Sequence, residues 1–273
     1  MSARSEHDDA LVLRSVDYRD ADRIVTLLTR RHGKLSALAR SARNSKRRFA
    51  GALEGFALLD IEVAIGNSEL AHLQSARVTR VFSNLLADLS RLTAAGALLR
   101  LARELIPERV PDDEIFDALL ASLEAFDRID LPVAPLQICL ELQLLALTGF
   151  APLLSACGRC GKRAEQGRAA DFDPRRGSLI CQACGGASLR LNGSLRERML
   201  AAISGDVISA LQTDGETNAA LQTDGETNAA SQTDDPQAGA WSPDDLATAR
   251  RLLENFIAHR LARPGRAVPN DPV

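Results

Sequence analysis

The sequence predicts an α+β protein: an N-terminal OB-fold β-barrel, followed by an all-helical domain with an inserted four-cysteine zinc ribbon. Three observations lead to this fold class. Short β-type runs fill the first 80 residues, the apolar period becomes helical from Leu85 onward, and two CxxC pairs are separated by 20 residues. A chain of 273 residues is long enough for two or three such modules.

The first 80 residues have the pattern of a small closed barrel. Five short runs of β-branched residues or leucine are separated by polar turns, and the fourth run alternates apolar and polar residues. The runs are Ala10–Val16, Arg23–Thr29, Lys34–Arg40, Leu59–Ile65 and Glu69–Val78. A brief helix is expected near Lys46–Leu53. A three-layer α/β fold fits poorly, because the helical crossovers that parallel strands need are missing.

The middle of the chain is predicted to be helical. One apolar face starts at Leu85 and stops before Pro107, and Pro111–Asp113 is a helix start signal. Leu136–Leu147 is apolar on nearly every side, which predicts a buried helix. Cys139 lies in that helix and is interpreted as a small core hydrophobe, not a ligand.

Two further helices are predicted after the cysteines, over Ser194–Ile203 and Pro243–Leu261. The second begins at a capping sequence with acids in its first turn, and its apolar face is expected to pack on the earlier helices. Between them, LQTDGETNAA at Leu211–Ala220 is repeated without change at Leu221–Ala230. Such polar repeats bury too little apolar surface to fold. Tandem duplication in a tolerated loop is preferred over a regulatory or spacer role.

These predictions divide the chain into seven segments. They are an OB-fold nucleic-acid-binding domain (1–80), a helical domain (81–155), a zinc-ribbon module (156–188), a continuation of the helical domain (189–206), a disordered repeat insertion (207–240), a C-terminal helix (241–263) and a flexible tail (264–273).

The cysteines give the strongest signal in the sequence. Cys157 and Cys160 form one CxxC pair, Cys181 and Cys184 form the other, and a glycine follows each pair. Each CxxC turn directs two thiolates at one point, which suits one tetrahedral Zn²⁺, and Phe172–Gly177 offers a turn between two short strands. Redox-active thiols and disulfides are the alternatives, and the matched pairs disfavour both. Four thiolates fill the coordination shell, so the predicted zinc is structural.

No catalytic constellation is apparent, and the protein is expected not to be an enzyme. The phosphate-loop, dinucleotide-binding and nucleophile-elbow motifs are absent. The four histidines match no metal or triad spacing; they are His7, His32, His72 and His259. His32 lies among basic residues, and a turn histidine is preferred over a phosphate contact.

A basic stretch from Arg30 to Arg48 contains eight Lys/Arg and no acid, although the whole chain has a formal net charge of −3. These eight residues are the candidate DNA contacts: Arg30, Arg31, Lys34, Arg40, Arg43, Lys46, Arg47 and Arg48. A solvated loop is the alternative, but so dense a run without acids favours nucleic acid.

The N-terminal segment offers few aromatic side chains for base stacking, namely Tyr18, Phe49 and Phe56. Binding is therefore expected to be mainly electrostatic, weakly selective and open to single and double strands. If about four to six phosphates are neutralised, log K on single strands should fall with a slope of about −3 to −4 against log salt.

The chain resembles the bacterial RecO recombination-mediator family. The resemblance rests on VLRSVDYRDADRIVTLLTRRHGKLSALARSAR, FALLDIEV, LTGFAPLLSACGRCG and the terminal RRLLENFIAHRL. It covers nearly all of the chain except Leu211–Gly239 and the two ends. The repeats and the net negative charge depart from the family pattern.

The resemblance implies an OB-fold, a helical domain with a zinc ribbon, and binding to single- and double-stranded DNA. It implies annealing of complementary strands coated with single-strand binding protein, and cooperation with RecR to help RecA load on gapped DNA. It places DNA in the region of the basic stretch without assigning individual contacts.

Three classes of function are weighed. A DNA-repair mediator leads, and an OB-fold and zinc-ribbon adaptor in transcription or RNA metabolism is the alternative. A zinc-dependent hydrolase would need an open coordination position, which four thiolates do not leave. No apolar run is long enough to cross a bilayer and MSARSEHDDA lacks a signal-peptide core, so a cytoplasmic, nucleoid-associated location is expected.

Overall fold

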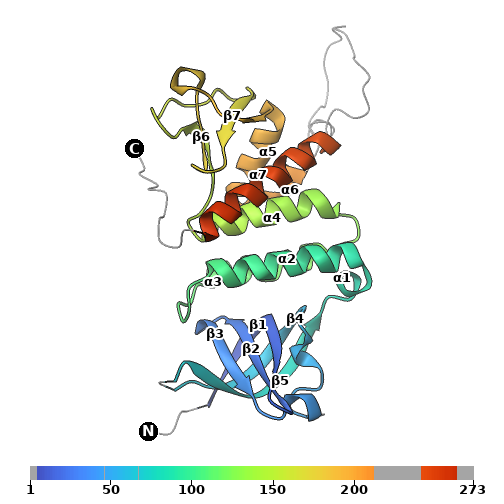
Figure 1. Cartoon of the computed structure of the whole chain (residues 1–273). Coiled ribbons are helices and arrows are strands. Elements are labelled where there is room, and N and C mark those ends of the chain that lie inside the picture. The colour runs from blue at the N-terminus through green and yellow to red at the C-terminus, as the bar shows by residue number, and fades with distance from the viewer. Residues whose placement is uncertain (1–4, 46, 67, 212–240, 263–273) are drawn as a thin grey trace, which may run out of the picture. The chain divides into compact units, whose positions relative to one another are not determined.

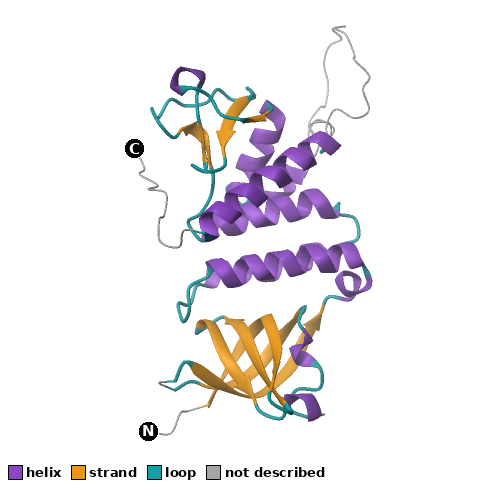
Figure 2. Ribbon diagram, in the orientation of Figure 1, coloured by secondary structure: helices purple, strands orange, loops and turns teal. Residues whose placement is uncertain are grey.

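The computed structural model describes residues 5–45, 47–66, 68–211 and 241–262. The chain divides into two compact units, Met1–Gly149 and Phe150–Val273. Figure 1 shows the elements in chain order, and Figure 2 shows that the first unit joins strands to helices. Residues 212–240 of the insertion and the tail 264–273 lie outside the described residues, so the disorder and flexibility expected there stay predictions. The insertion was expected to be disordered from residue 207, but Val207–Leu211 forms a short helix, so that part of the prediction is wrong.

The first unit begins with five strands that close into a barrel. They are β1 (Ser5–Tyr18), β2 (Asp22–Thr29), β3 (Gly33–Ala39), β4 (Ala57–Ala64) and β5 (Leu70–Val81). Their order is β1-β2-β3-β5-β4, and β4 pairs back with β1. All pairs are antiparallel except β3 with β5, which run parallel. The predicted mixed α+β class is confirmed, and all five predicted runs form strands.

The barrel core consists of inward-facing side chains from every strand, including Val25, Leu35 and Ile61. The segment between β3 and β4 adds Phe49 and Leu53, which are 1% and 2% exposed. Because these two side chains are inserted among the strand residues, the segment closes one part of the barrel core.

The brief helix expected near Lys46–Leu53 is found only in part, as a 3₁₀ turn that starts at Ala52. The described residues there form turns, with short 3₁₀ turns at Ala42–Asn44 and Ala52–Glu54. Ala50 and Gly51 have φ angles of 39° and 81°, and such left-handed residues end a right-handed helix.

Four helices complete the first unit: α1 (Ser83–Ala87), α2 (Leu89–Leu105), α3 (Asp113–Asp127) and α4 (Val133–Leu147). The single face predicted from Leu85 is divided, because the Asp88 carboxylate accepts hydrogen bonds from the Ser90 and Arg91 amides and starts α2. Asp112 caps α3 in the same way through the Ile115 amide. Cys139 is fully buried in α4, as predicted.

The second unit contains a four-stranded sheet and three helices. The strands are β6 (Leu153–Cys157), β7 (Ala170–Asp173), β8 (Ser178–Leu179) and β9 (Leu189–Leu191), in the order β6-β8-β7-β9. The helices are α5 (Gly193–Ile203), α6 (Val207–Leu211) and α7 (Pro243–Leu261). Ser242 and Asp245 form a capping box at the start of α7. The packing of α7 on the earlier helices stays a prediction.

None of the helices in the described ranges is long and apolar enough to cross a bilayer.

Candidate functional site

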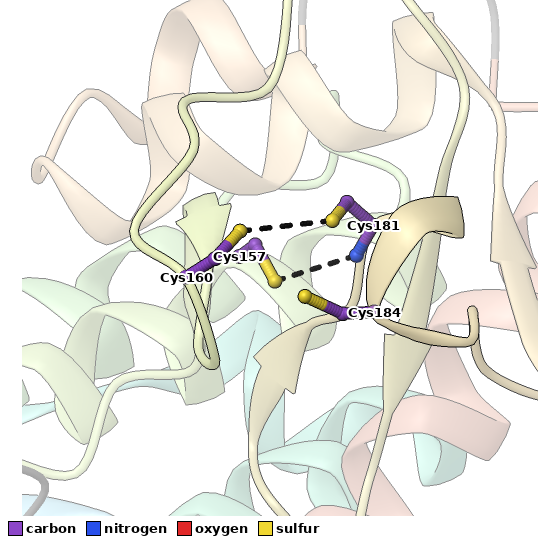
Figure 3. Close-up of side chains that lie close together, drawn as sticks. All are labelled: Cys157, Cys160, Cys181 and Cys184. Atoms are coloured by element: carbon purple, nitrogen blue, oxygen red, sulfur yellow. Dashed lines mark hydrogen bonds between the residues drawn. The ribbon is translucent and has the colours of Figure 1, made fainter.

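The four predicted cysteine ligands meet in the second unit, as Figure 3 shows. Their sulfur atoms all lie within 4.8 Å of one another, and the Cys160 and Cys181 sulfurs are 3.7 Å apart. Four sulfurs at about 2.3 Å from a tetrahedral Zn²⁺ would be about 3.8 Å apart, so the cluster is close to the size that this ion needs. All five cysteines are free thiols in the structure. The four thiols therefore lie close enough to bind a metal ion.

Two tight turns hold the cysteines in place. Cys157 ends β6, and the amide of Gly161 donates to the Cys157 carbonyl oxygen at 2.9 Å. Gly185 follows the 3₁₀ turn Gln182–Cys184 with a φ of 104°, a conformation that favours glycine. A Cβ at Gly158 would lie 2.2 Å from the Ser178 hydroxyl oxygen, so the strands approach closely beside the cluster.

The backbone also favours a thiolate in this cluster. Burial opposes ionisation of Cys157, but amide hydrogen bonds led by that of Cys181 lower the pKa of its thiol to about 6. Hydrogen bonds with Cys181 and Cys160 raise the pKa of the Cys184 thiol to about 12. Thiolates are the form that binds metal, and a divalent cation would remove the mutual repulsion of four of them.

Two members of the basic stretch are held by the helices of their own unit. The Arg30 guanidinium donates to Asp117 at 2.5 Å and lies over the Phe116 ring at 4.4 Å. The Lys34 side chain is 9% exposed, and its ammonium group donates to the Arg103 carbonyl oxygen at 2.6 Å and lies 3.4 Å from Glu108. These two cations are therefore engaged within the protein.

Three other members line two adjacent grooves on the barrel. Arg47 and Arg48 line a groove of about 530 Å³, and Arg40 and Arg48 line a second of about 560 Å³. Arg48 and Ser75 belong to both, so the grooves are continuous along β5. We call this surface, lined by Arg40, Arg47 and Arg48, the barrel groove. The Arg48 guanidinium is held by the Arg40 carbonyl oxygen at 2.8 Å and lies 5.2 Å from the Phe49 ring centre.

The remaining members lie apart from this groove or outside the described residues. Arg43 is 3.7 Å from Asp17 and donates to the Asp20 carbonyl oxygen. Arg31 has an exposed side chain, while its amide donates to Asp8. Lys46 lies outside the described residues.

The structure adds Arg77 and His72 of β5 to the barrel groove. Arg77 is 77% exposed on its side chain and lies 3.0 Å from Asp60, whose pKa is lowered by hydrogen bonds from His7 and Arg77. The sequence signal that could have placed Arg77 and His72 on this surface is the polar residues at alternate positions of β5. The shift in pairing between Glu62 and Val63 interrupts that alternation, which is why sequence reasoning missed them.

The aromatic residues of the barrel offer little for base stacking. Phe49 is buried in the core, and Tyr18 is 37% exposed beside Arg19. His32 is a turn residue whose Nδ1 lies 2.9 Å from the buried Asp8 carboxylate. Its contacts are those of a structural histidine.

Comparison with known proteins gives matches over both units. The family described as Recombination protein O N terminal matches residues 1–82, and Recombination protein O C terminal matches residues 86–222. The DNA repair protein RecO of Myxococcus xanthus is 36% identical over 264 residues, covering 96% of this chain and 94% of its own. That of Anaeromyxobacter dehalogenans strain 2CP-C is 46% identical over 175 residues, covering 64% and 68%.

A closed barrel with an arginine-lined groove, followed by a module whose four thiols lie close enough to bind a metal ion, defines a class of protein with the charge to meet a polyanion and the ligands to hold a metal. The family matches then show to which family of proteins the chain belongs. The chain belongs to the RecO family of DNA repair and recombination proteins.

Proposed function

We propose that this protein is a DNA-repair recombination mediator that binds single- and double-stranded DNA along the barrel groove and anneals complementary strands. The observation that carries the proposal is the convergence of Arg40, Arg47, Arg48 and Arg77 on continuous grooves of the N-terminal barrel. Phosphates bind to such guanidinium groups with release of counterions, independently of base sequence. RecO-named relatives support the assignment to DNA repair.

The barrel has the strand number, the closed order and the single parallel pair that we assign to an OB-fold. Its groove differs from aromatic single-strand sites because arginines, not exposed rings, line it. Binding is therefore electrostatic and tolerant of both strand states. Two strands whose phosphates are neutralised at neighbouring positions repel each other less, which accelerates pairing.

The cysteine cluster is assigned one structural Zn²⁺, held by Cys157, Cys160, Cys181 and Cys184. Four thiolates complete its tetrahedral shell, so the ion stabilises the zinc ribbon and leaves no position for an activated water. The protein then acts by binding, with no covalent chemistry. In the cell it would work with RecR on strands coated by single-strand binding protein and help RecA load there.

The first prediction tests the barrel groove. Arg47→Ala/Arg48→Ala removes two phosphate contacts, so the slope of log K against log salt on oligo-dT should become shallower by about 1.4. Annealing of complementary oligonucleotides coated with single-strand binding protein should slow with it. Fluorescence anisotropy over a salt series and strand-pairing kinetics measure the two effects.

A matched control is Arg100→Ala/Arg128→Ala, which removes the same charge from exposed positions of the same unit, one in α2 and one directly after α3. Its salt slope should stay close to that of the wild type. If both double variants lost the same DNA affinity and the same salt slope, only the net charge would matter. That result would refute DNA binding along the barrel groove. Preference for RNA over DNA in competition would favour the adaptor alternative.

A further inference from the structure

The barrel groove contains two acids as well as its arginines. Asp60 lines the part of about 530 Å³, and Glu62 lines the part of about 560 Å³. Both belong to β4, whose residues Leu59, Ile61 and Val63 face the barrel core. Because strand side chains alternate between faces, the two acids lie on the outer face, two positions apart. Carboxylates repel phosphates, so these acids indicate a contact of another kind within the groove.

Each carboxylate is held by a side chain of β5. Arg77 is opposite Asp60 in the strand register, and Ser75 is opposite Glu62. The Arg77 guanidinium donates to Asp60 at 3.0 Å, and the Ser75 hydroxyl donates to Glu62 at 3.4 Å. His7 of β1 lies 3.2 Å from Asp60 through its Nδ1. The hydrogen bonds from His7 and Arg77 lower the pKa of the Asp60 carboxyl, so this group is ionised at neutral pH.

Both carboxylates keep acceptor capacity for a ligand. An ionised carboxylate has about four lone-pair sites. The side-chain contacts described above use two of these sites on Asp60 and one on Glu62. The Asp60 side chain is 27% exposed, and Glu62 is half-buried. Each acid can therefore accept hydrogen bonds from a base that lies in the groove.

The four bases differ in what they offer to a carboxylate. On the edge that faces the major groove of a duplex, cytosine and adenine present an amino group, whereas thymine presents a carbonyl oxygen and guanine presents two acceptors. A carboxylate accepts a hydrogen bond from the amino group and repels the acceptors, and Asp and Glu contact cytosine through its N4 amino group. One hydrogen of this amino group is not used in base pairing. The contact is therefore compatible with annealing and with bound duplex.

We propose that Asp60 and Glu62 give the barrel groove a preference for strands rich in cytosine and adenine, with phosphates on the arginines and base amino groups on the carboxylates. The proposal rests on the DNA-binding function proposed above and adds a base preference to it. The preference is modest, because the arginine contacts are the same for every base. A metal ion does not account for the two acids, since in the described ranges the ligand atoms close enough to hold one are those of the cysteine cluster.

The test compares fluorescein-labelled oligo-dC and oligo-dT of equal length by fluorescence anisotropy, at pH 8 and 0.15 M salt. The wild type should bind oligo-dC about fivefold more tightly, which is the size of one net hydrogen bond. An amide both donates and accepts, so in Asp60→Asn/Glu62→Gln the ratio should fall to about 1. Affinity for oligo-dT should rise in this variant, because two negative charges are removed. A misfolded variant would instead bind both strands more weakly.

The matched control is Glu69→Gln/Glu114→Gln. It removes the same charge from exposed positions of the same unit that do not line the groove. Its affinity for both strands should change by the same factor, so that the wild-type ratio is kept. An equal fall of the ratio in this control would assign the preference to net charge and overturn the proposal.

An oligonucleotide of 2-pyrimidinone, which is cytosine without its amino group, tests the contact from the side of the ligand. The wild type should bind this strand as weakly as oligo-dT, because the donor is missing. The Asp60→Asn/Glu62→Gln variant should distinguish it from oligo-dC less than the wild type does. If the wild type binds the 2-pyrimidinone strand as tightly as oligo-dC, the amino group is not recognised and the proposal is wrong.

Failure of this proposal can be told apart from failure of the proposed function. Equal binding of oligo-dC and oligo-dT by the wild type, with both weakened in Arg47→Ala/Arg48→Ala, refutes the base preference alone. A wild-type preference that Asp60→Asn/Glu62→Gln retains would place the base contact on other residues and refute the role of the two acids. Absence of DNA binding by the wild type refutes the proposed function as well.

Discussion

Gly33, at the turn between β2 and β3, has a φ of 67° and no room for a side chain. A Cβ there would lie 2.2 Å from the Val110 carbonyl oxygen and 2.9 Å from the Pro111 nitrogen. Both neighbours are backbone atoms and cannot rotate away. This glycine therefore lets the turn contact the segment before α3.

We predict that Gly33→Ala lowers the free energy of unfolding by about 2–4 kcal/mol, since left-handed strain and a backbone clash add together. Urea denaturation followed by circular dichroism measures this change. Gly51→Ala is the control: its φ is 81°, but nothing lies within 4 Å of the added Cβ, so it should cost only about 1 kcal/mol. Equal costs for the two would show that the close approach to Val110 is unimportant.

Arg91 and Arg196 show how a buried cation can serve structure alone. Arg91 donates to the carbonyl oxygen of Phe126 in the last turn of α3 and to those of Arg128, Ile129 and Leu131 after it. Arg196, 1% exposed, donates to the carbonyl oxygen of Leu154 and to that of Glu165. Each satisfies several backbone carbonyl groups outside the regular hydrogen bonds of helix and sheet.

At the scale of elements, the strands β6–β9 are two to five residues long. Sheets this short bury little apolar surface, so a metal ion supplies much of the stability of such modules. We therefore expect the fold of this module to depend on metal binding by the four cysteines.

We predict that Cys184→Ser loses the metal ion and unfolds the cysteine module, because three remaining thiolates bind the ion more weakly. Metal content by atomic emission should fall from about one ion per chain to well below it, and calorimetry should show a lower-temperature transition. Cys139→Ala, a change to the cysteine buried in α4, should keep the metal. Full metal retention by Cys184→Ser would contradict the four-thiolate site.

At the scale of the whole molecule, one segment carries acidic residues without any basic ones. Residues 212–240 contain six Asp/Glu and no Lys/Arg. The residues that flank them are joined, because the Trp241 indole nitrogen donates to the Ala210 carbonyl oxygen at 3.0 Å. A short linker can therefore connect these two points without rearranging α6 or α7.

We predict that replacing 212–240 by a short Gly-Ser linker keeps the melting temperature and strengthens DNA binding at low salt. The formal net charge changes from −3 to +3, which raises the attraction to a polyanion and the association rate. Stopped-flow association at 50 mM and 300 mM salt measures the effect, which should shrink at the higher salt.

The control for this prediction keeps the length and changes the six acids to Asn or Gln. It should associate as fast as the deletion if charge is the cause. A gain seen only in the deletion would assign the effect to the length of the segment instead.

The sequence alone determined the features that depend on local spacing. Short β-branched or leucine-rich runs, one of them strictly alternating, specified the five barrel strands. Apolar runs and helix start signals specified α3, α4 and α7, and two CxxC pairs specified one four-thiol cluster. These signals are readable because strand period, helix period and knuckle geometry involve residues within a few positions of one another.

Only the tertiary structure decided which basic side chains are available to bind DNA phosphates. Arg30 and Lys34 belong to the same basic stretch as Arg48, yet their partners Asp117 and Arg103 are 87 and 69 residues away. Arg77 joins the barrel groove because β5 pairs with β4 through a shifted register. Side-chain pairing across such separations depends on tertiary packing, which no local sequence pattern encodes. A run of Lys and Arg therefore predicts a basic region, but it does not show which of these side chains remain available to bind DNA phosphates.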